Sequence, residues 1–90
     1  MAGWDVLFSP IAEADLSRFD THLRKSLNTK IAWLAVNFDT ITPSPLHIPF
    51  DGFYKLRVGK IRVIYTIEAD KRQLKIHHIE RRDRIYKRRN

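Results

Sequence analysis

The sequence predicts an α+β domain with a short amino-terminal strand, a two-helix hairpin and then a three-stranded antiparallel sheet. Three observations predict this class. Apolar residues recur at helical spacing in the first half of the chain, and they recur at a period of two after residue 52. The third observation is size, because 90 residues of which 43% are hydrophobic supply one modest core and no second one. We therefore expect a single domain over residues 1–90.

The first half of the chain begins with a predicted strand at residues 4–8, which stops at Ser9-Pro10. Ser9 can cap a helix, and Pro10 fits the first helical turn because its missing N–H would be unpaired there in any case. The apolar positions that follow predict two helices, with a break near Asp20-Thr21. These positions are Ala12, Leu16, Phe19, Leu23, Leu27, Ile31, Leu34 and Phe38.

Residues 39–49 contain three prolines and no periodic pattern, so we expect a loop that connects the helices to the sheet. The next segment alternates strictly, with Tyr54, Leu56 and Val58 on one face and Lys55 and Arg57 on the other. Lys55 and Arg57 are therefore predicted to point the same way.

Gly59-Lys60 predicts a tight turn into a second strand that runs to Glu68. Its apolar set is Ile61, Val63, Tyr65 and Ile67, and Arg62 lies opposite that set. If the apolar sets of both strands cover the helices, Arg62 shares the open face of the sheet with Lys55 and Arg57. A cationic face is thus expected from strand alternation alone.

Residues 69–72 reverse the chain into a third strand from Gln73, and this strand does not keep its alternation. Ile79 falls out of phase with Leu74 and Ile76, and a bulge near His77-His78 would restore the pattern. Two adjacent strand histidines point to opposite faces and no third metal ligand is apparent, so we interpret them as structural residues.

The bulge also decides which arginine reaches the open face. With a bulge, Glu80 and Arg82 face the open side and Arg81 points away, whereas without one Arg81 is the inward cation. We favour Arg82. The basic tail that follows, which includes Lys87 and Arg88, either contacts a polyanion or simply frays.

Charge is distributed unevenly along the chain. Residues 1–50 carry four Lys or Arg against five Asp or Glu, whereas residues 51–90 carry thirteen against five, which accounts for the net charge of +7. A basic half of this kind favours a polyanionic partner over a merely solvated face. The chain has no cysteine, no apolar run long enough to span a membrane and no signal-peptide pattern, so we expect a cytoplasmic protein without a disulfide or thiolate metal site.

The predicted order of elements, the segment 52–65 and the ending Arg82-Asp83-Arg84-Ile85-Tyr86 together resemble the RelE/ParE superfamily of toxin–antitoxin toxins, and its RelE branch in particular. The resemblance implies a RelE-like fold with a twisted sheet of about four strands. It also implies a ribonuclease that cuts messenger RNA in the ribosomal A site and is silenced by a cognate antitoxin. Such a toxin–antitoxin complex can bind DNA through the antitoxin.

The RelE branch carries a basic set and a terminal tyrosine, and the matching positions here are the expected catalytic residues. They are Lys55, Arg57, Arg62, Arg82 and Tyr86. The branch often has lysine at the position of Arg57, and the doublet Arg81-Arg82 leaves the last arginine open by one residue. Further RNA contacts are expected from Lys60, Arg81, Lys87 and Arg88.

The chemistry of such a set needs no metal or other cofactor, because the 2′-hydroxyl of the RNA can be the nucleophile. Lys55 is the candidate base, Arg57 and Arg62 the phosphate clamp, Arg82 the stabiliser of the leaving group, and Tyr86 a stacking or hydrogen-bonding group. Three other interpretations stay open, namely a ParE-like inhibitor of DNA gyrase, an RNA-binding module without turnover and an inactive toxin. The partners expected of the nuclease are messenger RNA, ribosomal RNA and the antitoxin, with no membrane.

Overall fold

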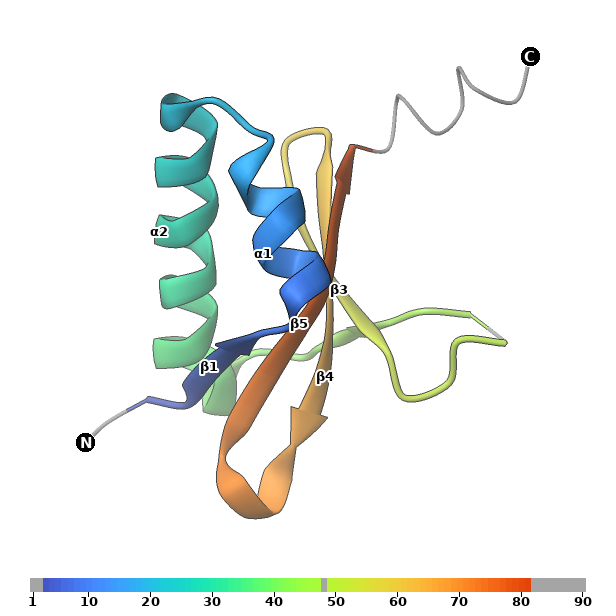
Figure 1. Cartoon of the computed structure of the whole chain (residues 1–90). Helices are drawn as coiled ribbons and strands as arrows, with labels where there is room; N and C mark the ends of the chain where they lie inside the picture. Colours follow the sequence, from blue (N-terminus) through green and yellow to red (C-terminus); the bar gives the residue numbers. More distant parts are fainter. Residues whose placement is uncertain (1–2, 48, 82–90) are drawn as a thin grey trace.

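The structure is a computed structural model, which describes residues 3–47 and 49–81. Two helices and a five-stranded sheet make up this part of the chain (Figure 1). The helices are α1 (Pro10–Ser17) and α2 (Thr21–Asn37), with 3₁₀ turns at Phe38–Thr40 and Ala69–Lys71. The strands are β1 (Asp5–Phe8), β2 (Ser44–Pro45), β3 (Tyr54–Val58), β4 (Ile61–Glu68) and β5 (Gln73–Arg81). The predicted α+β class is therefore confirmed.

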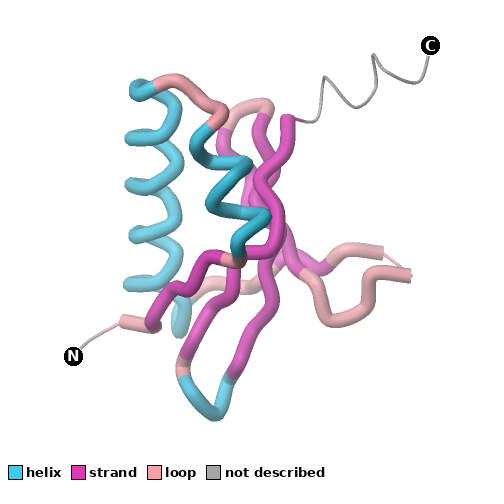
Figure 2. The backbone as a smooth tube through the Cα atoms, viewed as in Figure 1, coloured by secondary structure: helices cyan, strands magenta, loops and turns pink. Residues whose placement is uncertain are grey.

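The sheet has the order β1-β5-β4-β3-β2, in which β1 runs parallel to β5 and every other neighbouring pair is antiparallel. Both helices lie on one side of the sheet, and the segment between β2 and β3 extends to the other side (Figures 1 and 2). The core is formed between the helices and the sheet. Its buried residues are Ala12, Leu27, Ile31, Leu34, Phe38, Ile61, Val63, Tyr65, Leu74, Ile76 and Ile79.

The start of each helix follows from a capping side chain. Ser9 Oγ accepts a hydrogen bond from the backbone N–H of Ala12 at 3.0 Å, and Asp20 Oδ1 accepts one from Leu23 at 2.9 Å. Each bond satisfies a donor that has no partner within its own helix. The predicted helix start at Ser9-Pro10 and the predicted break near Asp20 are both confirmed.

The strand count differs from the expected four, because the sheet has five strands. The additional strand is β2, within the segment expected to be only a connecting loop. A strand of two residues has no periodicity that a sequence could display. Pro45 is tolerated there because β2 is an edge strand, where a missing N–H need not interrupt a ladder.

The predicted irregularity in the third strand of the antiparallel part is present. Ile64 pairs with His78 whereas Tyr65 pairs with Ile76, so His77 is the additional residue of a bulge in β5. The bulge returns Ile79 to the core side, where the residue is 2% exposed. Glu80 consequently faces the open side of the sheet, as its pairing with Arg62 requires.

Candidate functional site

Three charged residues lie side by side across the open face of the sheet. Arg57 of β3 is directly opposite Arg62 of β4, and Arg62 is directly opposite Glu80 of β5. Side chains in such cross-strand pairs stand about 5 Å apart at Cβ and can act on one ligand. Lys55 lies two residues before Arg57, on the same face and about 7 Å away along the strand. We call Lys55, Arg57 and Arg62 the basic face.

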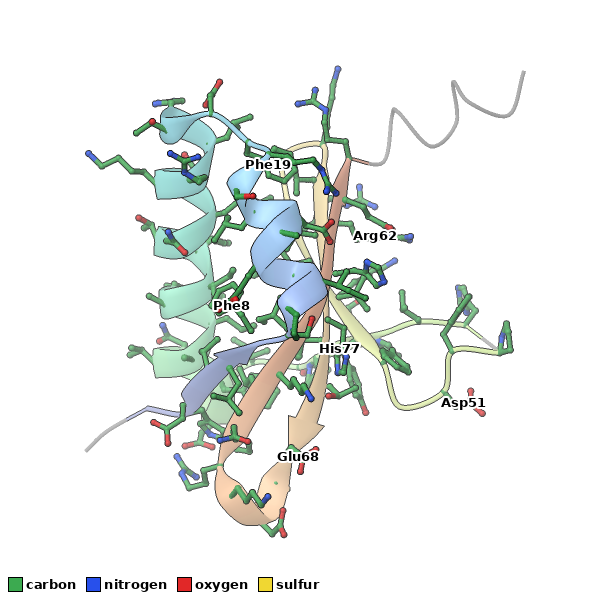
Figure 3. All side chains as sticks on the ribbon, viewed as in Figure 1. Phe8, Phe19, Asp51, Arg62, Glu68 and His77 are labelled. Atoms are coloured by element: carbon green, nitrogen blue, oxygen red, sulfur yellow. The ribbon has the colours of Figure 1, made fainter. Side chains whose placement is uncertain are left out.

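Arg62 and Glu80 form an ion pair. The Nε of Arg62 donates to Glu80 Oε2 at 3.0 Å, and a terminal guanidinium nitrogen, Nη2, donates to the same oxygen. Both side chains are 28% exposed, so the pair is accessible from solvent yet partly shielded from it. Figure 3 shows Arg62 on the side of the sheet away from the helices. The Glu80 carboxylate therefore occupies the edge of the guanidinium that Nε and Nη2 form.

A hollow of about 70 Å³ adjoins the basic face at the turn between β3 and β4. Its lining residues are Arg57, Gly59, Lys60, Ile61 and Arg62. The turn depends on Gly59, whose φ of 61° lies in the left-handed region that residues with a Cβ seldom adopt. The sequence thus turns tightly enough here to place Lys60 beside the two arginines.

His77 lies farther along the open face, in the middle of β5. Its Nε2 is 2.8 Å from Thr66 Oγ1, and its ring meets the ring of Phe53 edge to face at a centroid distance of 5.3 Å. Burial lowers the pKa of His77, and the neighbouring positive charges of Lys75 and His78 lower it further. The imidazole of His77 is thus held by a threonine and an aromatic ring, which fits the structural role that the sequence predicts.

The bulge that orients Glu80 is held from the helix layer by Asp15 of α1. This buried carboxylate accepts a hydrogen bond from the backbone N–H of Ile79 at 3.0 Å, and it also contacts Arg18 and the Nδ1 of His78. β1 pairs with β5 only as far as Ile76, so Asp15 supplies an acceptor where the parallel strand has ended. Asp15 was not singled out from the sequence, and nothing local to it signals this contact.

The structure brings some of the predicted site residues together and separates one from the rest. Lys55, Arg57 and Arg62 share the open face, and Lys60 borders them. Arg81 pairs with Ile61, a core residue, and therefore lies on the helix side of the sheet. The remaining predicted residues lie outside the described part of the chain; they are Arg82, Tyr86, Lys87 and Arg88.

Glu80 is the charged member of the row that sequence reasoning placed on the open face without assigning it a role. The alternation of β5 after the bulge could have indicated its partner, because it puts Glu80 in phase with Arg62 across the ladder.

Within residues 3–47 and 49–81, no three His, Asp or Glu side chains gather as a metal site would require. No helix in the same residues is long and apolar enough to cross a membrane.

Comparison with known proteins places this geometry in context. A family model described as the ParE toxin of the type II toxin–antitoxin system parDE matches residues 6–86. A comparison with curated proteins found no match.

Solved structures with the same fold include toxins from bacteria and archaea. The RelBE2 toxin–antitoxin complex from Mycobacterium tuberculosis matches with a TM-score of 0.71 at 20% identity, over 91% of this chain and 94% of that one. The isolated RelE toxin of E. coli also matches with a TM-score of 0.71, at 14% identity over 97% and 99% of the two chains. The YoeB/ParE toxin from Agrobacterium tumefaciens matches with a TM-score of 0.70 at 15% identity, over 86% and 96%. At these identities the likeness shows the fold.

Proposed function

This chain belongs to the ParE toxin family of type II toxin–antitoxin systems, and we propose that it is a toxin of the RelE kind, an endoribonuclease that cuts messenger RNA in the ribosomal A site. The observation that carries the proposal is the basic face. Arg57 and Arg62 stand directly across one antiparallel ladder, and Lys55 lies one step along the same face. Three neighbouring cations on one face of the sheet suit the stabilisation of a phosphate that gains charge during cleavage.

The expected reaction uses the 2′-hydroxyl of the RNA as nucleophile and leaves a 2′,3′-cyclic phosphate and a 5′-hydroxyl. The guanidinium groups of Arg57 and Arg62 bind the non-bridging oxygens, for which their forked donors are well matched. Lys60, which lines the hollow, contacts the RNA backbone next to the reacting phosphate in this proposal. The resemblance to the RelE branch assigns Arg82 to the leaving group and Tyr86 to the adjacent nucleotide.

The ribosome has a defined part in this proposal. A site that acts by charge and position must receive its substrate in a fixed orientation, since proximity alone can supply a large share of the rate enhancement. The isolated protein is therefore expected to cut free RNA poorly. Outer contacts to ribosomal RNA are assigned to Arg81, Lys87 and Arg88, and the place of action is the cytoplasm.

A cognate antitoxin is the second proposed partner. Several of the matching solved structures are complexes of a RelE toxin with a RelB antitoxin. An acidic or amphipathic antitoxin segment that covers either the basic face or the helices would neutralise this chain, because opposite charge speeds and orients such association. DNA binding by the resulting complex would reside in the antitoxin.

The experiment is cleavage of messenger RNA in purified ribosomes that present a single known codon in the A site. Lys55→Ala, Arg57→Ala and Arg62→Ala should each lower the rate of cleavage about 100-fold or more, because each removes a cation from the reacting phosphate. Lys25→Ala, at an exposed position on α2, is the matched control and should cut like the wild type.

One alternative is favoured by a specific observation, namely that the matching family model is described as a ParE toxin. In that case the protein would inhibit DNA gyrase by contact and would need no cleavage chemistry. Intact messenger RNA on the programmed ribosomes, together with loss of supercoiling by purified gyrase, would replace the nuclease proposal with this one.

A further inference from the structure

Glu80 is placed where a proton acceptor for the cleavage reaction is needed. Its carboxylate is bound by the guanidinium of Arg62, and Arg62 stands across the ladder from Arg57. The 2′-hydroxyl that attacks the phosphate is attached to the same ribose as the scissile linkage, so its base must lie within a few ångströms of the groups that bind the phosphate. Glu80 meets this requirement through its contact with Arg62.

The guanidinium of Arg62 can hold Glu80 and a phosphate at the same time. Its Nε and Nη2 both donate to Glu80 Oε2, whereas no bond to its Nη1 is made by the part of the chain that the structure describes. The remaining donors of the planar group can therefore reach a phosphate oxygen without displacement of the carboxylate. Arg62 would then fix the distance between the base and the reacting phosphate.

Lys55 is the competing candidate for the base, and the arrangement favours Glu80. A lysine ammonium has to lose a proton before it can accept one, whereas a carboxylate can accept a proton as it stands. Lys55 lies opposite Ile64 in the ladder, one row away from the row of Arg57, Arg62 and Glu80. A charged ammonium in that place is suited to stabilise the negative charge that grows on the phosphate.

We propose that Glu80 is the general base of this site and that Lys55 acts as a charge-stabilising group. The proposal rests on the endoribonuclease function given above. In the step, the 2′-hydroxyl proton moves to a carboxylate oxygen of Glu80 while the bond from O2′ to phosphorus forms. The bond from phosphorus to O5′ breaks with its electron pair on O5′, which takes a proton from water. The products are a 2′,3′-cyclic phosphate and a 5′-hydroxyl, and Glu80 returns its proton to solvent.

The test is single-turnover cleavage on the programmed ribosomes with saturating wild-type or Glu80→Gln protein. The glutamine keeps the shape and an oxygen acceptor for Arg62 but is a far weaker base. We expect the rate to fall about 100-fold or more, the range usual for loss of a general base, with no loss of affinity for the ribosome. Glu80→Asp retains a carboxylate and should retain part of the rate. Glu68→Gln, at the far end of β4, is the control and should cut normally.

The dependence of the rate on pH is the second measurement. The charged and titratable groups around Glu80 are Arg62 of β4, Arg57 of β3 and, one row along, Lys55. His78, in the same row as Lys55, has its Nδ1 3.4 Å from the Asp15 carboxylate of α1. If Glu80 is the base, the wild-type rate falls as the solution becomes acidic, and this acidic limb is missing in Glu80→Gln. A rate that instead rises into the alkaline range in both proteins would assign the base to Lys55.

The other outcomes overturn the assignment in different ways. A Glu80→Gln protein that cuts within threefold of the wild type would reduce Glu80 to a residue that merely positions Arg62. A faster rate in both Glu80→Gln and Glu80→Ala would make the carboxylate a competitor for the phosphate site. If wild-type protein leaves the messenger intact, the proposed function fails and this assignment fails with it, a result distinct from loss of activity in the variants alone.

Discussion

Replacement of Asp15 by alanine should destabilise the protein far more than replacement of an exposed acid on the same helix. The Asp15 carboxylate is buried and accepts a hydrogen bond from the backbone N–H of Ile79 at 3.0 Å. Loss of that acceptor leaves a buried N–H without its partner, which costs about 1–3 kcal/mol. The contact with Arg18, whose side chain is 70% exposed, adds only about 0–1 kcal/mol.

The expected total for Asp15→Ala is about 1–4 kcal/mol in the free energy of unfolding. For a domain of this size the melting temperature should fall by about 4–8 °C for each kcal/mol lost. Asp15→Asn keeps an oxygen that can accept from Ile79, so its loss should be smaller by about 1 kcal/mol. Glu13→Ala removes an exposed acid from the same helix and should stay within about 0.5 kcal/mol of the wild type.

Urea unfolding measures these free energies, and amide hydrogen exchange reports on the bond itself. In Asp15→Ala the amide of Ile79 should exchange faster than in the wild type, because its protecting acceptor is gone. If Asp15→Ala and Glu13→Ala unfold at the same urea concentration, the bulge in β5 is held by other contacts and the argument from Asp15 is refuted.

Three further predictions follow from the core and the basic face. Leu27→Ala removes a fully buried side chain and should lower the free energy of unfolding, measured in urea, by about 2–5 kcal/mol. Val36→Ala, at a site 70% exposed, should lower it by less than about 0.5 kcal/mol. Similar losses for the two variants would contradict the packing described. Burial raises the pKa of Tyr65 to about 12 from 10.0, so the folded state keeps a proton that the unfolded state loses, and stability should fall by up to about 3 kcal/mol as the pH rises from about 10 to 12. The difference in unfolding free energy between wild type and Tyr65→Phe over that range measures this loss, and a constant difference would exclude it. Arg57→Gln should reduce the slope of the logarithm of the binding constant for single-stranded RNA against the logarithm of salt concentration by about 0.7, as expected for one lost phosphate contact. Lys25→Gln should leave this slope unchanged. An unaltered slope in Arg57→Gln would show that Arg57 does not contact the phosphate.

Strand alternation was sufficient to predict the basic face, because the side-chain period of a strand is a local property. Lys55 and Arg57 are two residues apart on β3 and must share a face, and Arg62 follows from the turn at Gly59-Lys60. The bulge in β5 could also be inferred, since it brings Ile79 into phase with Leu74 and Ile76. In each case the information lies within a few residues of the position concerned.

Tertiary structure alone decided the contacts that join distant segments. The Arg62–Glu80 pair depends on the register of β4 against β5, and the contact of Asp15 with Ile79 spans 64 positions in the sequence. The sequence does not indicate the partner of either carboxylate, Glu80 or Asp15, because a carboxylate can accept a hydrogen bond from any donor that the folded chain brings near. The sequence by itself thus determined which residues face the open side of the sheet. The folded chain decided that the Glu80 carboxylate pairs with Arg62, since only strand pairing and helix packing set distances between remote positions.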